Sequence, residues 1–342
     1  MKKWAIYGLC VLSMLTGGFQ VSAEESDSSQ LAGGYTIEGV PSDHQLDKEV
    51  SYFYLKEQPG EKDQVKVKLT NDSSKEKTLE VKITNANTNA NGAVDYTGKI
   101  KDHAALKTPL TSIAKASESE VKVPAKSSVE TAIDINMPSE TMHGVVVGGI
   151  VVSEKQEEEE AKKELSLGNI YTYTLGLVLT NESEVEPKKN VSVELDNVGA
   201  ILFDGKKIVQ ADILNPNPYI FPGATVKGEI SKKGSNEVIK KEEKENVNIA
   251  PYSVYPFQFD WKKEDLKPGK YLFKGSVEAD GKTWEFEKEF EITSDKAKEI
   301  NEKSVFKIYI PKWLTYGVYG LIIVSIGGTI YIIVRRKKRE AA

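Results

Sequence analysis

The sequence of 342 residues is poor in the side chains and motifs that carry most enzyme chemistry. It has a single cysteine, Cys10, so it can form no internal disulfide and differs from the disulfide-rich secreted domains. Because Cys10 lies in an N-terminal apolar run, the rest of the chain has no thiol nucleophile. We find no P-loop, no GxSxG elbow and no GxGxxG turn that opens a helix. These absences argue against nucleotide binding and serine hydrolysis.

Histidines and metal-binding patterns are also scarce. The three histidines, His44, His103 and His143, show no HExxH or HxH spacing and are predicted to be surface or turn residues. The acidic run 157–160 lacks the alternating oxygen ligands and central glycine of a calcium loop. We therefore expect no metal site and no cofactor. Paired carboxylates of the glycosidase type stay open as an alternative, because acidic residues are frequent and no pair stands out.

Long apolar runs occur only near the two ends of the sequence. Residues 1–23 begin with two lysines, continue with an apolar core and end in the small-x-small triplet Val21-Ser22-Ala23. This order predicts a secretory signal peptide that is cut after Ala23. A retained membrane anchor is the alternative, and the short apolar core argues against it.

A second apolar run, residues 314–334, contains no charge and is followed by the basic run 335–339. A helix that rises about 1.5 Å per residue would cross the roughly 30 Å hydrocarbon core over this length. The positive-inside rule predicts a cytoplasmic tail (335–342) and an extracellular bulk, as in a single-pass protein of the cell membrane. No Leu-Pro-x-Thr-Gly motif precedes the run, so we expect no covalent attachment to a wall.

Charge is unevenly distributed along the chain. The net charge is −5, yet seven of the 46 basic residues lie in the two terminal segments, with only one of the 51 acidic ones. The region between them therefore carries a net charge near −11. This excess argues against nucleic acid or an anionic lipid surface as the partner of that region.

Alternation of apolar and polar residues dominates the region between the two ends. Clear examples are "QVKVKL" (64–69), "LEVKI" (79–83) and "WEFEKEFEI" (284–292), separated by turn sequences rich in Gly, Pro and Asn. Short strands with one solvent-exposed face predict an all-β fold of two tandem immunoglobulin-like β-sandwich domains of antiparallel strands before the C-terminal membrane helix. The last hairpin is expected to turn at Asp280-Gly281, and the matching hairpin of the first domain to pair "GVVVGGIVV" (144–152) with "IYTYTLGLVL" (170–179). The charged run 153–165 is expected to be a solvated loop or a short helix.

An internal repeat supports two domains. "LTN" occurs at 69–71 and again at 179–181, but the segments that follow differ in order. A better counterpart of Asn71 is Asn215, because each is followed by a strand, a proline-containing turn and a glycine at similar spacing. We therefore predict a first domain over 31–180 and a second over 181–294. A boundary nearer 160 is the alternative.

Two segments of the first predicted domain are candidates for ligand binding. In "SYFYLKEQPGE" (51–61), Tyr52 and Tyr54 share the face opposite Phe53 and Leu55, so one pair is expected in the core and the other exposed for stacking. The segment "NANTNANGAVDYTG" (85–98) gathers amide, carboxylate and hydroxyl groups that hold sugars or peptides by hydrogen bonds. Its candidate residues are Asn85, Asn87, Asn89, Asp95 and Tyr96. The alternative is an Asn-rich loop beside edge-strand aromatics.

The order of these segments resembles the WxL-interacting proteins of Gram-positive bacteria. "YTIEGVPSDHQLDKEVSYFYLKEQPGE" with "HGVVVGGIVVSE" is similar to their first domain, and "IAPYSVYPFQFDW" with "LKPGKYLFKGSVEADGKTWEFEKEFEI" to their second. The resemblance implies a peptidoglycan-binding-type domain, a host-binding-type domain, association with WxL-domain surface proteins, and no catalysis. It supplies no catalytic residue.

These observations predict a membrane-anchored cell-surface adaptor that binds WxL-domain proteins and peptidoglycan and contributes to adhesion. Host extracellular proteins are further expected partners. The alternatives are a surface sensor or transport accessory protein and, less favoured, a wall-polymer hydrolase. The short tail after the predicted membrane helix argues against the sensor.

Overall fold

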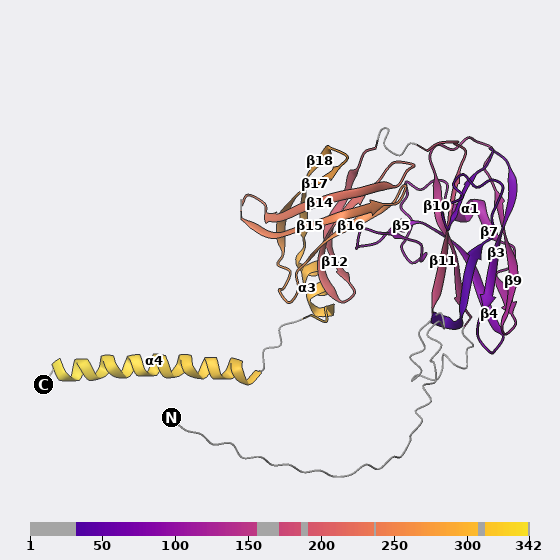
Figure 1. Cartoon of the computed structure of the whole chain (residues 1–342). Coiled ribbons are helices and arrows are strands. Elements are labelled where there is room, and N and C mark those ends of the chain that lie inside the picture. Colours follow the sequence, from indigo (N-terminus) through magenta and orange to yellow (C-terminus); the bar gives the residue numbers. More distant parts are fainter. Residues whose placement is uncertain (1–31, 156–170, 186–190, 236, 307–311, 341–342) are drawn as a thin grey trace, which may run out of the picture.

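A computed structural model of the protein describes residues 32–155, 171–185, 191–235, 237–306 and 312–340. Its strands form two β-sandwiches, and two helices follow them (Figure 1). The predicted signal peptide and residues 156–165 of the predicted charged helix lie outside the described residues. The first two residues of that predicted helix, Ser153 and Glu154, instead end a strand.

The first sandwich packs a four-stranded sheet against a five-stranded sheet. The four-stranded sheet has the order β1 (Tyr35–Gly39), β3 (Lys62–Asn71), β9 (Ser127–Asn136), β7 (Ala114–Ala116). The five-stranded sheet has the order β2 (Phe53–Lys56), β11 (Thr172–Thr180), β10 (Val146–Glu154), β4 (Lys77–Asn85), β8 (Glu120–Val123). A short helix, α1 (Leu110–Ile113), and a small ribbon of β5 (Asn87–Thr88) and β6 (Val94–Asp95) complete this domain.

The predicted alternation of apolar and polar residues identifies which side chains of the first domain lie in its core. On β3, Val65, Val67 and Leu69 are buried, whereas the lysines between them are exposed. The hairpin of β10 and β11 is antiparallel, as expected, and belongs to this sandwich. A departure from the predicted antiparallel pattern is that β2 pairs in parallel with β11. The two strands are distant in sequence, so a long connection allows this direction.

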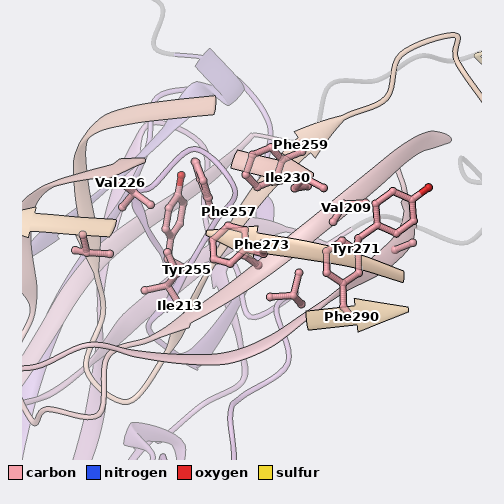
Figure 2. Close-up of a cluster of buried hydrophobic side chains, with 14 of the residues drawn as sticks. Val209, Ile213, Val226, Ile230, Tyr255, Phe257, Phe259, Tyr271, Phe273 and Phe290 are labelled. Atoms are coloured by element: carbon pink, nitrogen blue, oxygen red, sulfur yellow. The ribbon is translucent and has the colours of Figure 1, made fainter. Parts of the chain in front are cut away.

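The second sandwich packs a three-stranded sheet against a four-stranded one. The three-stranded sheet has the order β12 (Glu194–Phe203), β13 (Lys206–Leu214), β16 (Val254–Asp260). The other has the order β15 (Val238–Ile249), β14 (Phe221–Lys232), β17 (Gly269–Ala279), β18 (Lys282–Ile292). Aromatic rings fill the space between the sheets, and Figure 2 shows Phe257, Phe259 and Phe273 turned toward one another.

The last hairpin turns at Asp280-Gly281, as the sequence predicts. Both residues have positive φ, 48° and 74°, which a two-residue hairpin loop of the I′ type requires. Glycine adopts this geometry without a steric penalty, and aspartate tolerates it better than most residues. The turn therefore fixes the register of β17 on β18, with Ala279 opposite Lys282.

The internal repeat is confirmed in atomic detail by two buried asparagines. The Asn71 side chain donates to three backbone carbonyls at 2.8, 2.9 and 3.2 Å, those of Lys75, Val123 and Pro124. The Asn215 side chain does the same at 2.8, 3.0 and 3.0 Å, with Tyr219, Ile249 and Ala250. Each also accepts a hydrogen bond from the backbone N–H two residues later. Both side chains are fully buried, so each ties a strand end to a distant strand in its own domain.

The second "LTN" has a different role, which agrees with its interpretation as coincidence. Asn181 donates to the carbonyl of Glu57 at 2.8 Å and accepts from the N–H of Met142 at 2.7 Å. It thus joins loops of the first domain instead of closing a turn like Asn71.

The two sandwiches contact each other through the segment that carries β5 and β6. Thr88 Oγ1 lies 2.7 Å from Ser253 Oγ and accepts the N–H of Ala250 at 2.9 Å. The N–H of Asn248 donates to the carbonyl of Gly92 at 2.7 Å. A small apolar cluster surrounds these bonds: Ala86, Val94, Tyr96, Val145, Val147, Val178 and Ala250.

Two helices follow β18. Helix α3 (Ser294–Lys303) begins at Thr293, whose side chain accepts the N–H of Lys296, and it adds Ala297 and Ile300 to the second core. Helix α3 is a departure from the all-β expectation for this part of the chain. Helix α4 (Lys312–Glu340) contains the predicted membrane run, and its window Tyr316–Ile333 is long and apolar enough to cross a membrane by length and composition. The side chains in this window are exposed.

Candidate binding face on the first domain

The residues at the start of β2 alternate between the core and the outer face of the five-stranded sheet, as predicted. Phe53 and Leu55 are buried in the first core. Tyr52 is 41 % exposed and Tyr54 is half-buried on the opposite face. The outer face therefore carries aromatic rings that the core does not use.

A pair of glycines makes room for these rings. Gly149 on β10 and Gly176 on β11 lie directly opposite each other in the register. A Cβ atom on Gly176 would lie 3.3 Å from the Cβ of Tyr52, and one on Gly149 would lie 3.0 Å from the Cβ of Tyr96. The two tyrosine side chains thus pack over a strip of bare backbone, which larger residues would fill.

The structure therefore brings together three of the predicted site residues, Tyr52, Tyr54 and Tyr96, which we call the tyrosine face. Burial raises the pKa of the Tyr54 and Tyr96 hydroxyls, and the neighbouring Tyr52 hydroxyl raises both further. The Tyr54 and Tyr96 hydroxyls are consequently neutral at physiological pH, and each can donate and accept a hydrogen bond.

A cavity of about 560 Å³ opens beside Tyr52. Its walls are the end of β1, the loop from Val40 to Ser51 and the start of β2, together with Leu175. The cavity and the tyrosine face share Tyr52, so a ligand on the face could extend into the cavity.

The other predicted site residues lie in internal hydrogen bonds. Asn85 and Asn87 are buried, and their amides donate to the two carboxylate oxygens of Asp102 at 2.6 and 2.8 Å. Asn89 accepts the N–H groups of Asn91 and Ala93 and so closes a turn.

Asp95 accepts the N–H and the hydroxyl of Thr97 at 2.9 and 2.6 Å. The Asn-rich segment thus shapes the loop that carries Tyr96 and that reaches the second domain. A ligand-binding role for Asn85, Asn87, Asn89 and Asp95 stays a prediction.

Sequence reasoning missed a cluster of titratable groups beside β2. The Nδ1 atom of His44 lies 2.9 Å from Glu57 Oε2 and 3.4 Å from Asp63 Oδ2, and Glu61 is also near. Burial raises the pKa of Glu57 to about 7, although the hydrogen bond from His44 lowers it. One signal was available: Glu57 continues the inward alternation of Phe53 and Leu55, where an apolar residue is expected.

The described fold is therefore that of a tandem immunoglobulin-like β-sandwich protein with an aromatic outer face on its first domain and one apolar C-terminal helix. Two family models match the chain: the peptidoglycan binding domain of WxL Interacting Protein over 35–154, and the host binding domain of WxL Interacting Protein over 162–302. The chain belongs to the WxL-interacting protein family. These domain types support an adhesion-type role at the cell surface.

Several solved structures share features of the fold at low similarity. A Pseudomonas aeruginosa CupB2 chaperone is 13 % identical, with 66 % of this chain and 91 % of that chain covered and a TM-score of 0.27. The E. coli chaperone DraB is 13 % identical, with coverages of 70 % and 94 % and a TM-score of 0.28.

The Acinetobacter baumannii CsuC–CsuE chaperone–tip subunit complex is 10 % identical, with coverages of 74 % and 97 % and a TM-score of 0.31. At these scores the three structures support no argument about this chain. No curated protein matches it.

Proposed function

We propose that this protein is a membrane-anchored adaptor of the Gram-positive cell surface that binds peptidoglycan through its first domain and holds WxL-domain proteins. The tyrosine face of the first domain is the observation that carries the proposal. Aromatic rings offer apolar faces to the C–H groups of a sugar, and their hydroxyls bond its polar edge. The Tyr52 and Tyr96 side chains occupy the space left by Gly176 and Gly149, so a polymer on this face would contact side chains instead of the backbone.

The anchor in this proposal is the apolar part of α4. With residues 314–334 in the membrane and the basic run 335–339 on the cytoplasmic side, both sandwiches face outward. We propose that the boundary between the two domains follows Thr180, because β11 pairs with β10 and β2 of the first sandwich. The second unit would then include α3, which packs on its core.

A WxL-domain protein, or a host extracellular protein, would bind at an exposed sheet edge by adding a strand. Main-chain hydrogen bonds supply affinity in this mode, and alternate side chains supply specificity. Edge strand β18 of the second domain suits it, because its eleven residues place the half-buried Trp284 and Phe286 beside the edge. Edge strand β15 suits it less, because its ladder with β14 contains register shifts, and bulges at an edge discourage pairing.

We infer no catalytic role. Among the described residues the His44 ring nitrogen contacts carboxylates, and the nearby Ser42 hydroxyl accepts the backbone N–H of His44 at 3.1 Å instead of bonding the ring. Both matching domain types are named for binding. The protein would thus act by holding partners at the surface.

The test is retention of the full chain, in detergent micelles, on purified peptidoglycan sacculi. We expect Tyr52→Ala and Tyr96→Ala to reduce retention by about tenfold or more, since removing one large apolar side chain from a buried contact costs roughly 1.5–3 kcal/mol. The matched control is Tyr171→Ala, because Tyr171 is equally exposed at 40 % and is not part of the tyrosine face.

Wild-type protein that does not bind sacculi, or tyrosine-face variants that bind as well as Tyr171→Ala, would refute the glycan contact. A parallel retention assay on an immobilised WxL-domain protein tests the second contact independently. There we expect the tyrosine variants to behave as wild type and a proline at Glu287 of β18 to weaken binding, because it removes an edge N–H. Binding to neither target would refute the adaptor.

A further inference from the structure

A buried carboxylate with a free oxygen lies at the end of β2. Glu57 is fully buried and faces the interior, because it follows Phe53 and Leu55 in the inward register. Its Oε2 atom accepts the hydrogen bond from His44 Nδ1 at 2.9 Å. Its Oε1 atom has no hydrogen-bond partner among the described residues. Leaving a buried oxygen unpaired costs about 1–3 kcal/mol, and more when the group is charged.

Two further carboxylates converge on the same imidazole. Asp63 Oδ2 lies 3.4 Å from His44 Nδ1, and it too is buried without a hydrogen-bond partner within the described part of the chain. Potential ligand atoms of His44, Glu57 and Glu61 all lie within 4.8 Å of one another. These three residues therefore share one small volume, which Asp63 approaches at His44, and Glu61 Oε2 also accepts the N–H of Gln58 at 2.6 Å.

The charges in this volume are not balanced by the protein. Three carboxylates face one imidazole, so protonation of His44 can balance the charge of only one of them. No lysine or arginine forms an ion pair with these carboxylates in the ranges that the structure describes. Buried charges are normally paired or bound to a metal ion, because burial of an unpaired charge is very costly.

The hydrogen bond between His44 and Glu57 is not a sufficient explanation of the cluster. It occupies one oxygen of Glu57 and leaves Glu57 Oε1 and Asp63 Oδ2 without partners. A divalent cation at the centre would contact these oxygens and balance the remaining charge.

We propose that His44, Glu57, Glu61 and Asp63 bind one divalent transition-metal ion of the Zn²⁺ type. One imidazole nitrogen and carboxylate oxygens are ligands that Zn²⁺ accepts readily, whereas Ca²⁺ prefers oxygen ligands alone. The ion would replace the proton on His44 Nδ1, so binding releases a proton when that nitrogen is protonated. The site is separate from the tyrosine face and does not rest on the proposed function.

The ion would add a link between the loop that holds His44 and the segment that begins β3. His44 lies between β1 and β2, Glu61 directly precedes β3, and Asp63 is its second residue. The backbone of Glu57 also bonds Thr180 and Asn181, where β11 ends. A bound ion would therefore fix the loop that forms one wall of the cavity beside Tyr52.

The test uses the full chain in detergent, purified without a histidine tag, stripped with a chelator and then titrated with ZnCl₂. We expect one Zn²⁺ per chain by elemental analysis after desalting and a higher thermal midpoint. His44→Ala and Glu57→Gln should each weaken Zn²⁺ binding by at least about tenfold, since even residues that only orient a ligand cost 10–100-fold. His143→Ala is the matched control, because His143 is 83 % exposed and away from the cluster.

Two results would overturn the proposal: wild-type protein that retains no Zn²⁺, or His44→Ala and Glu57→Gln proteins that bind it like His143→Ala. Titration with CaCl₂ distinguishes the metals, and a Ca²⁺ affinity above that for Zn²⁺ would also overturn it. His44 is partly exposed in a loop, so His44→Ala is expected to fold even if Glu57→Gln does not.

Discussion

The two sandwiches close with the same asparagine, yet aromatic residues occupy opposite places in them. In the described cores, the first domain buries two aromatic side chains, Tyr35 and Phe53, among aliphatic ones. The second buries eight: Phe221, Tyr255, Phe257, Phe259, Trp261, Tyr271, Phe273 and Phe290. Outside the cores, the first domain gathers tyrosines on one face, whereas the exposed Phe203 of the second ends β12 and the apolar residues of β18 alternate with glutamates.

This contrast indicates which domain offers an aromatic surface to a ligand. The rings of the second domain contact one another edge to face, with centroids 5.0 Å apart for Phe257 and Phe259. These ring contacts stabilise the core and leave no ring surface for a ligand. The Tyr52 ring is exposed, whereas Tyr54 is half-buried and Tyr96 also packs in the small cluster between the sandwiches, so a change at Tyr52 should alter binding more than folding.

The largest expected effect is a loss of stability in the second domain when a central ring of its core is removed. Phe273→Ala removes a fully buried side chain that packs on Phe259, and such changes cost about 3–5 kcal/mol. We expect faster hydrogen exchange in β13, β14, β16 and β17, measured by mass spectrometry on the full chain in detergent. Strands β3 and β9 should keep their protection. Equal loss of protection in both sandwiches would show that they unfold as one unit.

The two buried asparagines should contribute equally to the stability of their domains, although the two cores differ. Asn71→Ala and Asn215→Ala each leave three carbonyls without their buried donor, so we expect about 2–4 kcal/mol of destabilisation. Denaturant titrations monitored by domain-resolved hydrogen exchange measure both. Asn91→Ala, at an exposed turn, is the control and should stay within about 0.5 kcal/mol. A large difference between the two buried asparagines would contradict their equivalence.

Glycine substitutions separate stability from binding. A Cβ on Gly228 would lie 2.8 to 3.0 Å from three phenylalanine rings, so Gly228→Ala should cost about 1–3 kcal/mol through overpacking. Gly176→Ala should instead displace Tyr52, weaken retention on sacculi and change stability by less than about 1 kcal/mol. Tryptophan fluorescence reports the first effect, because Trp261 and Trp284 both lie in the second domain. A Gly176→Ala variant that binds normally would argue against the tyrosine face.

The sequence predicted those parts of the fold that depend on local pattern. Alternation in β3 and β18, the Asp280-Gly281 turn and the equivalence of Asn71 and Asn215 are visible in the order of residues. The alternation around Phe53 also predicted that Tyr52 and Tyr54 lie on the outer face of the sheet.

What the sequence could not predict depends on distant contacts. Tyr96 joins Tyr52 only because β10 and β11 place Gly149 opposite Gly176. Likewise, His44 meets Glu57 through the path of the loop between β1 and β2. Side-chain amides such as Asn85 look like ligand donors in a sequence, and only the fold shows that Asp102 accepts their hydrogen bonds.

The smallest expected effect concerns the contact between the sandwiches. Thr88→Val keeps the shape of the side chain but removes the oxygen that accepts the N–H of Ala250 and bonds Ser253, both of which are buried. We expect a cost of about 0.5–2 kcal/mol, because one buried N–H loses its acceptor. The loss should appear as faster exchange in the segments around β5 and Ala250, with both cores unchanged. Faster exchange throughout the second core would instead mean that this domain depends on the first for its stability, and the contrast between an independent aromatic core and an accessible aromatic face would then fail.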